Sequence, residues 1–352
     1  MPRPTFSPEN PDFRAALKTR VAEYFARTGK SQHADWRMIA KTGVFFGAFV
    51  GLLITLYSGV LPWFLALPAA GALGIVVAGI GFNIAHDAVH GAYSTNRYVN
   101  RVLGASSYNW SRAHNMVHHT FTNVPGADHD LEPGPFLLLH QRPRPAFIYR
   151  FQHLFAFPLY AFTMIVWVFK KDFAQIADRS MTGAGASKGG AASMISGKLF
   201  HFGLFLVLPM LVSPYAWWQV LVGYLVVLAV AGFTLAVVFQ LAHVVEGTAF
   251  PLPMANNKLR DGWASHQLRT TANFSQGSAA ATFFLGGLNN QIEHHLLPGV
   301  CHIHYAQLAP LVRQVALEHG LPYLDSGNFF QALAAHVRTL YRFGHPVALT
   351  AS

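Results

Sequence analysis

Two long uncharged stretches dominate the pattern of hydrophobic and polar positions along the chain. Thr42–Ala85 and Leu199–Ala242 each extend over 44 residues without Asp, Glu, Lys or Arg. Because about 20 apolar residues suffice for a helix to cross a bilayer, each stretch can hold two spans and a tight turn. Pro62 and Pro214 lie near the midpoints. The pattern predicts an all-α integral membrane protein with four transmembrane helices in two hairpins, over about 42–61, 63–85, 199–213 and 216–242.

A third apolar stretch, Phe151–Phe169, is shorter and more polar. It contains Gln152, His153 and Pro158, and cationic residues stand on both sides of it. We therefore expect an interfacial helix at about 151–169, lying on or dipping into the cytoplasmic leaflet, and no fifth span.

The rest of the chain is more polar. Residues 1–41 are expected to form a cytoplasmic N-terminal segment that is disordered over 1–12 and then helical and amphipathic from Asp12 to Thr28. Ser180–Gly197 is rich in Gly, Ser and Ala and is interpreted as a flexible loop. Residues 42–340 are expected to form one domain, and residues 341–352 a short C-terminal tail.

The distribution of charge indicates the orientation. Only 11% of the residues are charged, against about 25% in a typical soluble domain. The net charge is +10, and excess Lys and Arg normally mark the cytoplasmic side of a membrane protein. Cationic residues gather before the first uncharged stretch, among them Arg14, Lys18, Arg20, Arg27, Lys30, Arg37 and Lys41. Both termini and the polar segments are therefore expected in the cytoplasm, with the spans in a bacterial inner membrane. Nucleic acid is not an expected partner, because no basic run is interleaved with aromatic residues.

Histidine is concentrated in three clusters. They are HDAVH (His86, His90), HNMVHH (His114, His118, His119) and QIEHH (Gln291, His294, His295), and His243 follows the second uncharged stretch directly. Helical positions three and four apart share a face, and neutral imidazole is a good ligand for iron, copper and zinc. Eight histidines are too many for one tetrahedral zinc, so the spacing predicts two metals with roughly four ligands each.

The clusters also constrain the topology and the type of metal site. A span at 151–169 would put three crossings between the second and third clusters, which could then not share a site. Carboxylate-type di-iron proteins carry Glu-x-x-His pairs, which this chain lacks, so the histidine-rich type fits better. The nearest carboxylates in sequence are those of Asp87, Asp128, Asp130 and Glu293, and we expect some of them to accept imidazole N–H bonds.

These motifs resemble a known family. HDAVH, HNMVHHTFTN and QIEHH, in this order and with hairpins between them, resemble the three histidine boxes of the membrane fatty-acid desaturases and hydroxylases. Gln291 at the start of the third box, and the stretch GLNNQIEHHLLPGVCHIHY around it, are similar to the front-end desaturases, such as linoleoyl-CoA desaturase. The resemblance covers residues 42–340, which would form a desaturase domain.

The resemblance implies a fold, a cofactor and a reaction. It implies a cytoplasmic helical cap on four spans, two iron ions, and the removal of two hydrogens from an acyl chain with dioxygen as co-substrate. Zinc would be a substitute for iron in recombinant protein. Gln291 would be a catalytic residue that binds metal directly or through water. The metal ligands would be His86, His90, His114, His118, His119, His243, His294 and His295.

The resemblance also implies partners. The acyl group would be carried by CoA, by acyl carrier protein or by a lipid. The chain has no HPGG haem motif of a fused cytochrome b domain, so an external electron donor is expected, a ferredoxin or cytochrome with its reductase.

The sequence leaves alternatives open. The same di-iron centre could catalyse hydroxylation, epoxidation or acetylenation of an acyl chain, because the outcome depends on where the acyl chain lies relative to the iron. A membrane metal transporter or a zinc hydrolase is an alternative of a different class. A transporter would want polar ligands inside the spans, and a hydrolase would want about three histidines and a base.

Overall fold

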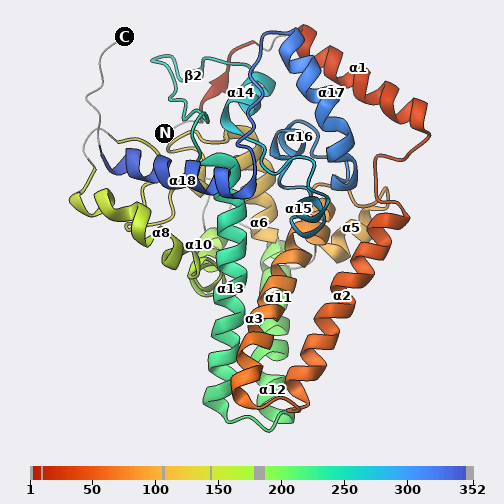
Figure 1. Ribbon diagram of the computed structural model, residues 1–352, viewed down its shortest axis with the longest axis vertical. Helices are drawn as coiled ribbons and strands as arrows, with labels where there is room; N and C mark the ends of the chain where they lie inside the picture. The colour runs from red at the N-terminus through yellow and green to blue at the C-terminus, as the bar shows by residue number, and fades with distance from the viewer. Residues whose placement is uncertain (1–2, 9–10, 105–107, 143–144, 178–186, 346–352) are drawn as a thin grey trace. The chain divides into compact units, whose positions relative to one another are not determined.

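The computed structural model describes residues 3–8, 11–104, 108–142, 145–177 and 187–345 (Figure 1). Its regular structure is predominantly helical, as predicted. Within these ranges the only named strands are β1 (Thr5–Phe6) and β2 (Lys258–Leu259), which pair in parallel. The chain divides into two compact units. The first unit comprises residues 1–33, 113–156 and 238–352, and the second comprises residues 34–112 and 157–237.

The second unit holds the segments that make up most of the long apolar helices. They are α2 (Trp36–Tyr57), α3 (Trp63–Ile80), α11 (Lys188–Phe202), α12 (Leu208–Val212) and the greater part of α13 (Trp217–His243). The π-helical turn η1 (Gly81–Ala85) joins α3 to α4 (His86–Val89), and η6 (Gly203–Val207) joins α11 to α12. The shorter helical segments are α5 (Arg97–Leu103), α6 (Tyr108–Ala113), α9 (Thr163–Val166), η5 (Trp167–Lys171) and α10 (Asp172–Ala177).

Four of the described helices are long and apolar enough to cross a membrane. They are Trp36–Tyr57, Trp63–Val89, Lys188–Val212 and Trp217–His243. This matches the number of spans predicted from the two uncharged stretches, before the bent segment described below is considered.

Two of these helices begin before the uncharged stretches do. The Asp35 carboxylate caps α2 by accepting the Arg37 N–H at 2.9 Å, and the Ser187 hydroxyl caps α11 by accepting the Gly190 N–H at 3.1 Å. The interpretation of Ser180–Gly197 as a loop is therefore wrong from Lys188 onward. Residues 180–186 lie outside the described part of the chain.

Helices α2, α3 and α13 pack through a buried cluster of Leu53, Ala70, Leu73 and Val227. Gly74 allows a close approach of α3 to α13, since a Cβ at this position would lie 2.7 Å from the Val227 carbonyl oxygen. Such contacts through small residues are typical of helices that pack in lipid, where the hydrophobic effect does not drive association.

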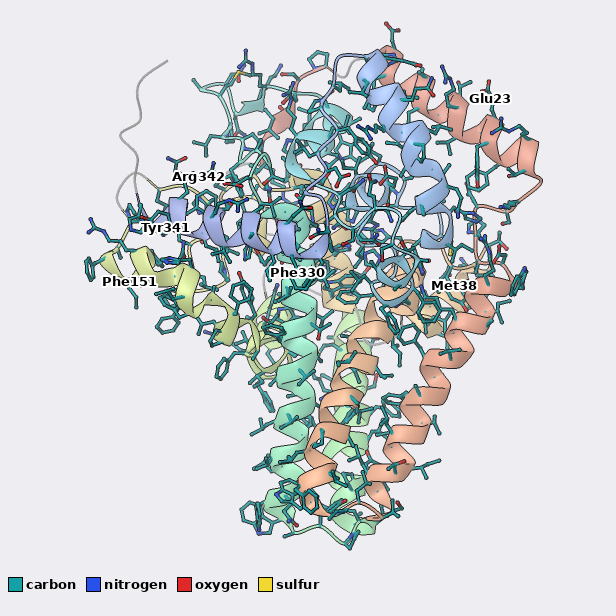
Figure 2. All side chains as sticks on the ribbon, viewed as in Figure 1. Glu23, Met38, Phe151, Phe330, Tyr341 and Arg342 are labelled. Atoms are coloured by element: carbon teal, nitrogen blue, oxygen red, sulfur yellow. The ribbon has the colours of Figure 1, made fainter. Side chains whose placement is uncertain are left out.

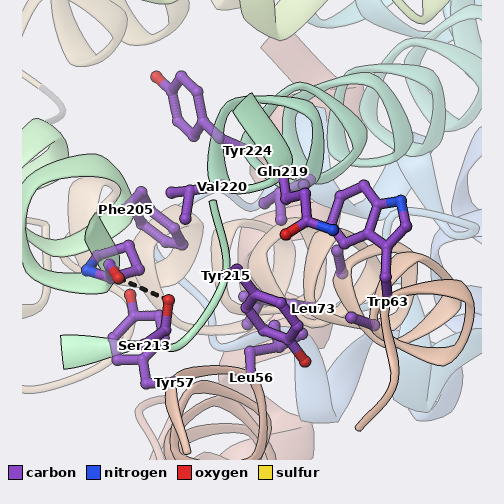
Figure 3. Close-up of a pocket in the computed structure, with 15 residues that line it drawn as sticks. Leu56, Tyr57, Trp63, Leu73, Phe205, Ser213, Tyr215, Gln219, Val220 and Tyr224 are labelled. Atoms are coloured by element: carbon purple, nitrogen blue, oxygen red, sulfur yellow. Dashed lines mark hydrogen bonds between the residues drawn. The ribbon is translucent and has the colours of Figure 1, made fainter. Parts of the chain in front are cut away.

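A pocket lies among these helices, within the second unit (Figure 3). Two of the hydroxyl groups in its wall are already bonded within the chain: the Tyr57 hydroxyl donates to the Leu204 carbonyl, and the Tyr215 hydroxyl donates to the Leu61 carbonyl at 2.6 Å. The wall is otherwise mostly apolar and includes Leu56, Trp63, Leu73, Phe205 and Val220.

The apolar segment around residue 160 is bent. The 3₁₀ turn η4 (Phe147–Phe151) leads into α8 (Gln152–Tyr160), and the helix Phe147–Tyr160 meets the helix Thr163–Ile176 at 70° across a short break. A bend of this kind is typical of a broken span or of a re-entrant segment. If the bent pair crossed the membrane as one span, the described helices would make five spans. The interfacial position at 151–169 stays a prediction.

The first unit has its own hydrophobic core. Helix α1 (Pro11–Thr28) lies along α17 (Tyr305–Glu318), and both pack against α14 (Trp263–Thr270) and α16 (Gln291–Leu296) (Figure 1). The buried side chains include Phe13 and Leu17 of α1, Leu268 of α14, Ile292 of α16 and Val312 of α17. The remaining segments of this unit are η2 (His114–His118), α7 (His119–Phe121), η3 (His129–Leu131), α15 (Ala279–Phe284), η7 (His302–His304) and α18 (Phe329–Gly344).

Helix α18 packs on the chain around residue 152. The Gln152 side-chain amide donates to the Leu340 carbonyl at 2.8 Å, and the rings of His153 and Tyr341 meet edge to face with their centroids 5.1 Å apart. Figure 2 labels Tyr341 on α18 and Phe151 directly before α8. These contacts use two of the polar residues that set 151–169 apart in the sequence.

The start of the chain is ordered where the structure describes it. Strand β1 is held by backbone bonds from the Thr5 N–H to Asn257 at 3.0 Å and from the Ser7 N–H to Leu259 at 3.1 Å. Phe6 stacks on Phe121 with ring centroids 5.9 Å apart. The prediction of disorder over residues 1–12 is therefore wrong for residues 3–8, because their pairing partner lies about 250 residues away in the sequence, beyond the reach of local patterns.

Candidate metal centre

The second histidine cluster lies in the π-helical turn η2, which α7 continues. A π turn closes i→i+5 bonds, and the His119 N–H donates to the His114 carbonyl. Residues five apart on an α-helix point about 140° away from each other. Here the π turn brings the Nε2 atoms of His114 and His119 to 3.1 Å. The cluster therefore gathers all three residues: the rings of His114 and His118, four residues apart, stack with centroids 5.4 Å apart, and His119 reaches His114 through its Nε2.

His118 is joined by one histidine from each of two other elements. His243 ends α13, and His295 lies in α16. All three are buried, and one ring nitrogen of each lies within 4.8 Å of one from each of the others. The ring centroids are 4.7 Å apart for His118 and His243, 5.1 Å for His118 and His295, and 5.0 Å for His243 and His295. Three imidazoles thus converge on one point within the first unit.

The second nitrogen of each of these rings faces an oxygen atom. The Nδ1 contacts are His118 with Asp128 Oδ2 at 3.1 Å, His295 with Gln267 Oε1 at 2.8 Å, and His243 with the Thr270 carbonyl at 3.4 Å. An oxygen acceptor at Nδ1 holds the ring proton there and leaves the Nε2 lone pair for a ligand. This arrangement is typical of metal-binding histidines, and an all-imidazole set suits iron or zinc.

A second group adjoins the first. His119, His294 and His295 also place ring nitrogens within 4.8 Å of one another, and His114 lies beside His119 as described above. His295 belongs to both groups. The Nδ1 of His295 is bonded to Gln267. Only the Nε2 of His295 is therefore available to bind a metal in one group or the other. The first unit therefore brings together six of the eight predicted ligands.

Gln291 lies at the same place. It is buried at the start of α16, and its Nε2 lies 2.9 Å from the Nε2 of His243. The two ends of an amide are assigned from the hydrogen-bond network, and in either orientation the Gln291 amide lies at the ring nitrogen that would bind a metal. The sequence predicts that Gln291 shares one helix face with His294 and His295, and the contact of Gln291 with His243 is compatible with this.

His86 and His90 lie in the second unit. Their ring centroids are 4.9 Å apart, and His86 is buried with its ring 5.7 Å from that of Trp110. The structure thus brings these two together as a pair. That His86 and His90 bind the same metal ions as the six histidines of the first unit stays a prediction.

The four carboxylates singled out by sequence have different surroundings. Asp128 accepts from His118, as expected, whereas Asp130 Oδ2 lies 3.7 Å from the same nitrogen, too far for a hydrogen bond. Glu293 instead contacts Asn273 and Tyr323 at 2.8 Å each. Burial raises the pKa of Glu293 to about 7, and these two hydrogen bonds oppose the rise. Asp87 lies in the second unit.

Several residues that shape the centre carry no signal in the sequence. Gln267 holds His295 and also accepts from the Thr122 hydroxyl at 2.8 Å. The Trp263 ring N–H donates to the His119 carbonyl at 2.9 Å, and the Asn123 amide donates to the His243 carbonyl at 2.8 Å. Single Gln, Trp and Asn residues are common in any chain, so only the fold shows that these act together.

Comparison with known proteins identifies the family. A sequence model of the family described as "Fatty acid desaturase" matches residues 58–327. The chain belongs to the fatty acid desaturase family. The desaturase is 34% identical to the sn-1 linoleoyl-lipid 6-desaturase of Synechocystis sp. (strain ATCC 27184 / PCC 6803 / Kazusa), over 94% of this chain and 95% of that protein.

Other relatives are desaturases as well. The chain is 33% identical to the acyl-lipid (8-3)-desaturase of Physcomitrium patens, over 96% of this chain and 72% of the relative. It is 29% identical to the Delta(5) fatty acid desaturase A of Dictyostelium discoideum, over 95% of this chain and 75% of the relative. The protein is therefore a membrane oxidoreductase of the desaturase family, which confirms the resemblance seen in the histidine boxes. The transporter and the zinc hydrolase are set aside.

Proposed function

We propose that this desaturase is a front-end enzyme that acts on an acyl chain carried by a membrane lipid. The proposal rests on relatives named for linoleoyl-lipid and acyl-lipid substrates and on Gln291 at the start of the third histidine cluster. The reaction would insert a new double bond between an existing one and the carboxyl end of the chain.

The observation that carries the proposal is the convergence of His118, His243 and His295, each with Nδ1 turned to an oxygen atom. These residues would hold one iron ion through Nε2. His114, His119 and His294 would belong to a second iron, and we further propose His86 and His90 as its remaining ligands. Bound iron with dioxygen would supply the oxidising power to remove hydrogen from an unactivated methylene.

The protein groups around these ligands would then have separate tasks. Asp128 and Gln267 hold the rings of His118 and His295 in one orientation, which lowers the reorganisation needed to bind an ion. Gln291 would contact the metal directly or through water. The six histidines of the first unit are buried. A site among them would exclude bulk water and so protect the reactive oxygen species from side reactions.

The proposed topology has four spans in two hairpins, with a cytoplasmic cap and both termini in the cytoplasm of a bacterial cell. It is supported by the four long apolar helices and by the cationic residues before α2. Reporter fusions after Pro62 and Pro214 should report the outside, and fusions after Arg112 and Lys188 should report the inside. Opposite sides for Arg112 and Lys188 would mean that the bent segment crosses the membrane.

We also propose that electrons come from a separate acidic carrier, a ferredoxin or cytochrome with its reductase. The +10 charge of the chain favours an acidic partner whose encounter weakens as salt rises. Purified protein with substrate, dioxygen and NAD(P)H should be inactive until such a carrier is added. Repeated turnover without a carrier would contradict the dependence.

A lipid analysis tests the main proposal. A host without 6-desaturation, supplied with linoleate, should gain a fatty acid with one more double bond on expression of the wild-type chain, and not on expression of His295→Ala. With a short pulse of labelled linoleate, the product should appear first in glycerolipid. First appearance in acyl-CoA or acyl carrier protein would contradict the lipid carrier, and a hydroxylated or epoxidised product would contradict desaturation.

A further inference from the structure

The short helix α16 depends on a residue outside it. It has six residues, Gln291–Leu296, and carries Gln291, His294 and His295. The residue before it, Asn290, makes no side-chain capping bond, so the first-turn N–H groups need acceptors from elsewhere. Asn273 supplies one: its Oδ1 accepts the Ile292 N–H at 2.9 Å.

The other end of the Asn273 amide is also engaged. Its Nδ2 donates to Glu293 Oε2 at 2.8 Å and lies 2.9 Å from the Tyr323 hydroxyl. The Tyr323 hydroxyl donates to Glu293 Oε1 at 2.8 Å and accepts from the Gln276 amide at 2.8 Å. Because the Ile292 N–H can only donate, the orientation of the Asn273 amide is determined by its neighbours.

The backbone of Asn273 is fixed independently. Its N–H donates to the Leu324 carbonyl at 2.9 Å, and its carbonyl accepts from the Ser326 N–H at 2.8 Å. Asn273 and Glu293 are fully buried. The amide therefore connects a segment anchored at residues 323–326 to the first turn of the helix that presents the third histidine cluster.

We propose that Asn273 is a positioning residue for the metal ligands: it caps α16 from outside and, with Glu293 and Tyr323, sets the helix so that His294 and His295 reach their partners. Asn273 does not touch the ligand nitrogens in this arrangement. It acts through the backbone of Ile292 and the side chain of Glu293, on the side of the helix that the ligands do not use. This inference rests on the proposed role of the histidines as ligands.

The test uses zinc as the probe, so that it does not depend on catalysis. Asn273→Ala removes the cap and the bond to Glu293, and we expect zinc affinity to fall by about 10- to 100-fold, the range found for lost supporting partners of metal ligands. Tyr323→Phe removes one hydroxyl and should weaken zinc binding less. In metal-free protein, hydrogen exchange of residues 288–298 should be faster in Asn273→Ala than in the wild type.

A charge-preserving exchange separates positioning from general stability. Asn273→Asp places two carboxylates side by side and should weaken zinc binding, whereas Asn273→Asp with Glu293→Gln restores a carboxylate–amide pair with the same total charge and should recover much of it. Asn289→Ala is the matched control, because Asn289 is equally buried but bonds to Ser275 and Thr282; it should lower the unfolding temperature with near-normal zinc affinity.

The outcomes are distinguishable. Wild-type zinc affinity and unchanged exchange over 288–298 in Asn273→Ala would overturn the proposal, and so would a double variant no better than Asn273→Asp. Equal losses of zinc affinity in Asn289→Ala would reduce Asn273 to a general packing residue. Because exchange is measured without metal, a chain that proves not to desaturate lipids would leave the exchange result standing.

Discussion

At the scale of single residues, the orientation of each imidazole depends on the atom that faces its Nδ1. Asp128 Oδ2 serves His118 and also accepts the Asn123 N–H at 3.0 Å, while Oδ1 accepts the Asp130 N–H at 3.1 Å. The carboxylate is buried and accepts these three hydrogen bonds, so it holds the His118 ring in place.

Asp128→Asn should therefore lower metal affinity by about 10- to 100-fold, because the amide can present a donor where His118 needs an acceptor. Asp130→Asn is the matched control, since Asp130 lies 3.7 Å from the same nitrogen and is partly exposed. Metal titration of both variants checks the prediction. Equal effects of the two substitutions would show that overall charge matters and not the contact with His118.

Gln291→Ala should abolish desaturation, and Gln291→His should not simply restore it. The Gln291 amide lies 2.9 Å from His243 Nε2, so a histidine there would compete for the same metal and change its coordination. Product yield and metal content per chain measure the effect. Gln314→Ala, on the exposed face of α17, is the control, and normal turnover in Gln291→Ala would reduce Gln291 to packing.

The residues of the site were predictable to different degrees. Histidines can be found from sequence because seven of them recur in three short clusters and the eighth, His243, directly follows an uncharged stretch. Their supports cannot, because Gln267, Asn273 and Thr270 are ordinary residue types that become specific only through contacts made across the fold.

At the scale of elements, π turns adjoin two of the three histidine clusters. Turn η1 ends directly before His86, and η2 contains the second cluster. Each π turn shifts the face of the helix that follows it, and such turns are frequent at functional sites. Hydrophobic periodicity locates the helices correctly but assumes one constant period, so it cannot show which histidines become neighbours.

Close helix contacts can be tested at two glycines of α13. A Cβ at Gly232 would lie 2.7 Å from the Met164 backbone nitrogen and 3.1 Å from the Ala161 carbonyl, whereas one at Gly223 would meet nothing within 4 Å. Gly232→Ala should destabilise the protein by about 1–3 kcal/mol through overpacking. Gly223→Ala should be neutral or stabilising by up to about 1 kcal/mol through helix propensity.

Thermal unfolding in detergent compares the two variants. Equal unfolding temperatures would contradict the contact between α13 and the chain at residues 161–164.

At the scale of the whole molecule, stability should depend on pH through buried groups. Burial lowers the pKa of His336 to about 4, although its Nδ1–H donates to the Val244 carbonyl at 2.7 Å. Between about pH 4 and 6.5 the unfolded chain binds the proton that the folded chain excludes. His336 therefore costs the fold stability as the pH falls through this window, by up to about 3 kcal/mol.

His336→Gln keeps a donor for Val244 and removes the titration, so its unfolding temperature should fall less than that of the wild type between pH 6.5 and 4.5. The comparison with the wild type is needed because Glu293, whose folded pKa is raised to about 7, acts with the opposite sign: its contribution is lost as the pH rises from 4.5 to 7. Parallel pH profiles for the two proteins would contradict the role of His336.

The general architecture can be predicted from the sequence, whereas many of the individual contacts cannot. Uncharged length alone indicates four apolar helices, because charged side chains are costly inside a bilayer. By contrast, the pairing of Thr5–Phe6 with Lys258–Leu259 and the bend after Tyr160 depend on partners or breaks that no local pattern encodes.

The packing of α1 on α17 has a consequence for the synthesis of the chain. Phe13 and Leu17 share a core with Val312 and Val315, so their partners leave the ribosome about 300 residues later, or roughly 15–60 s at 5–20 residues per second. Through that time the apolar side of the first helix has no native partner, while the long apolar helices are being inserted. Shelter by a chaperone or by the membrane surface would keep this apolar side from aggregating, and the helix is among the last elements to reach its final place.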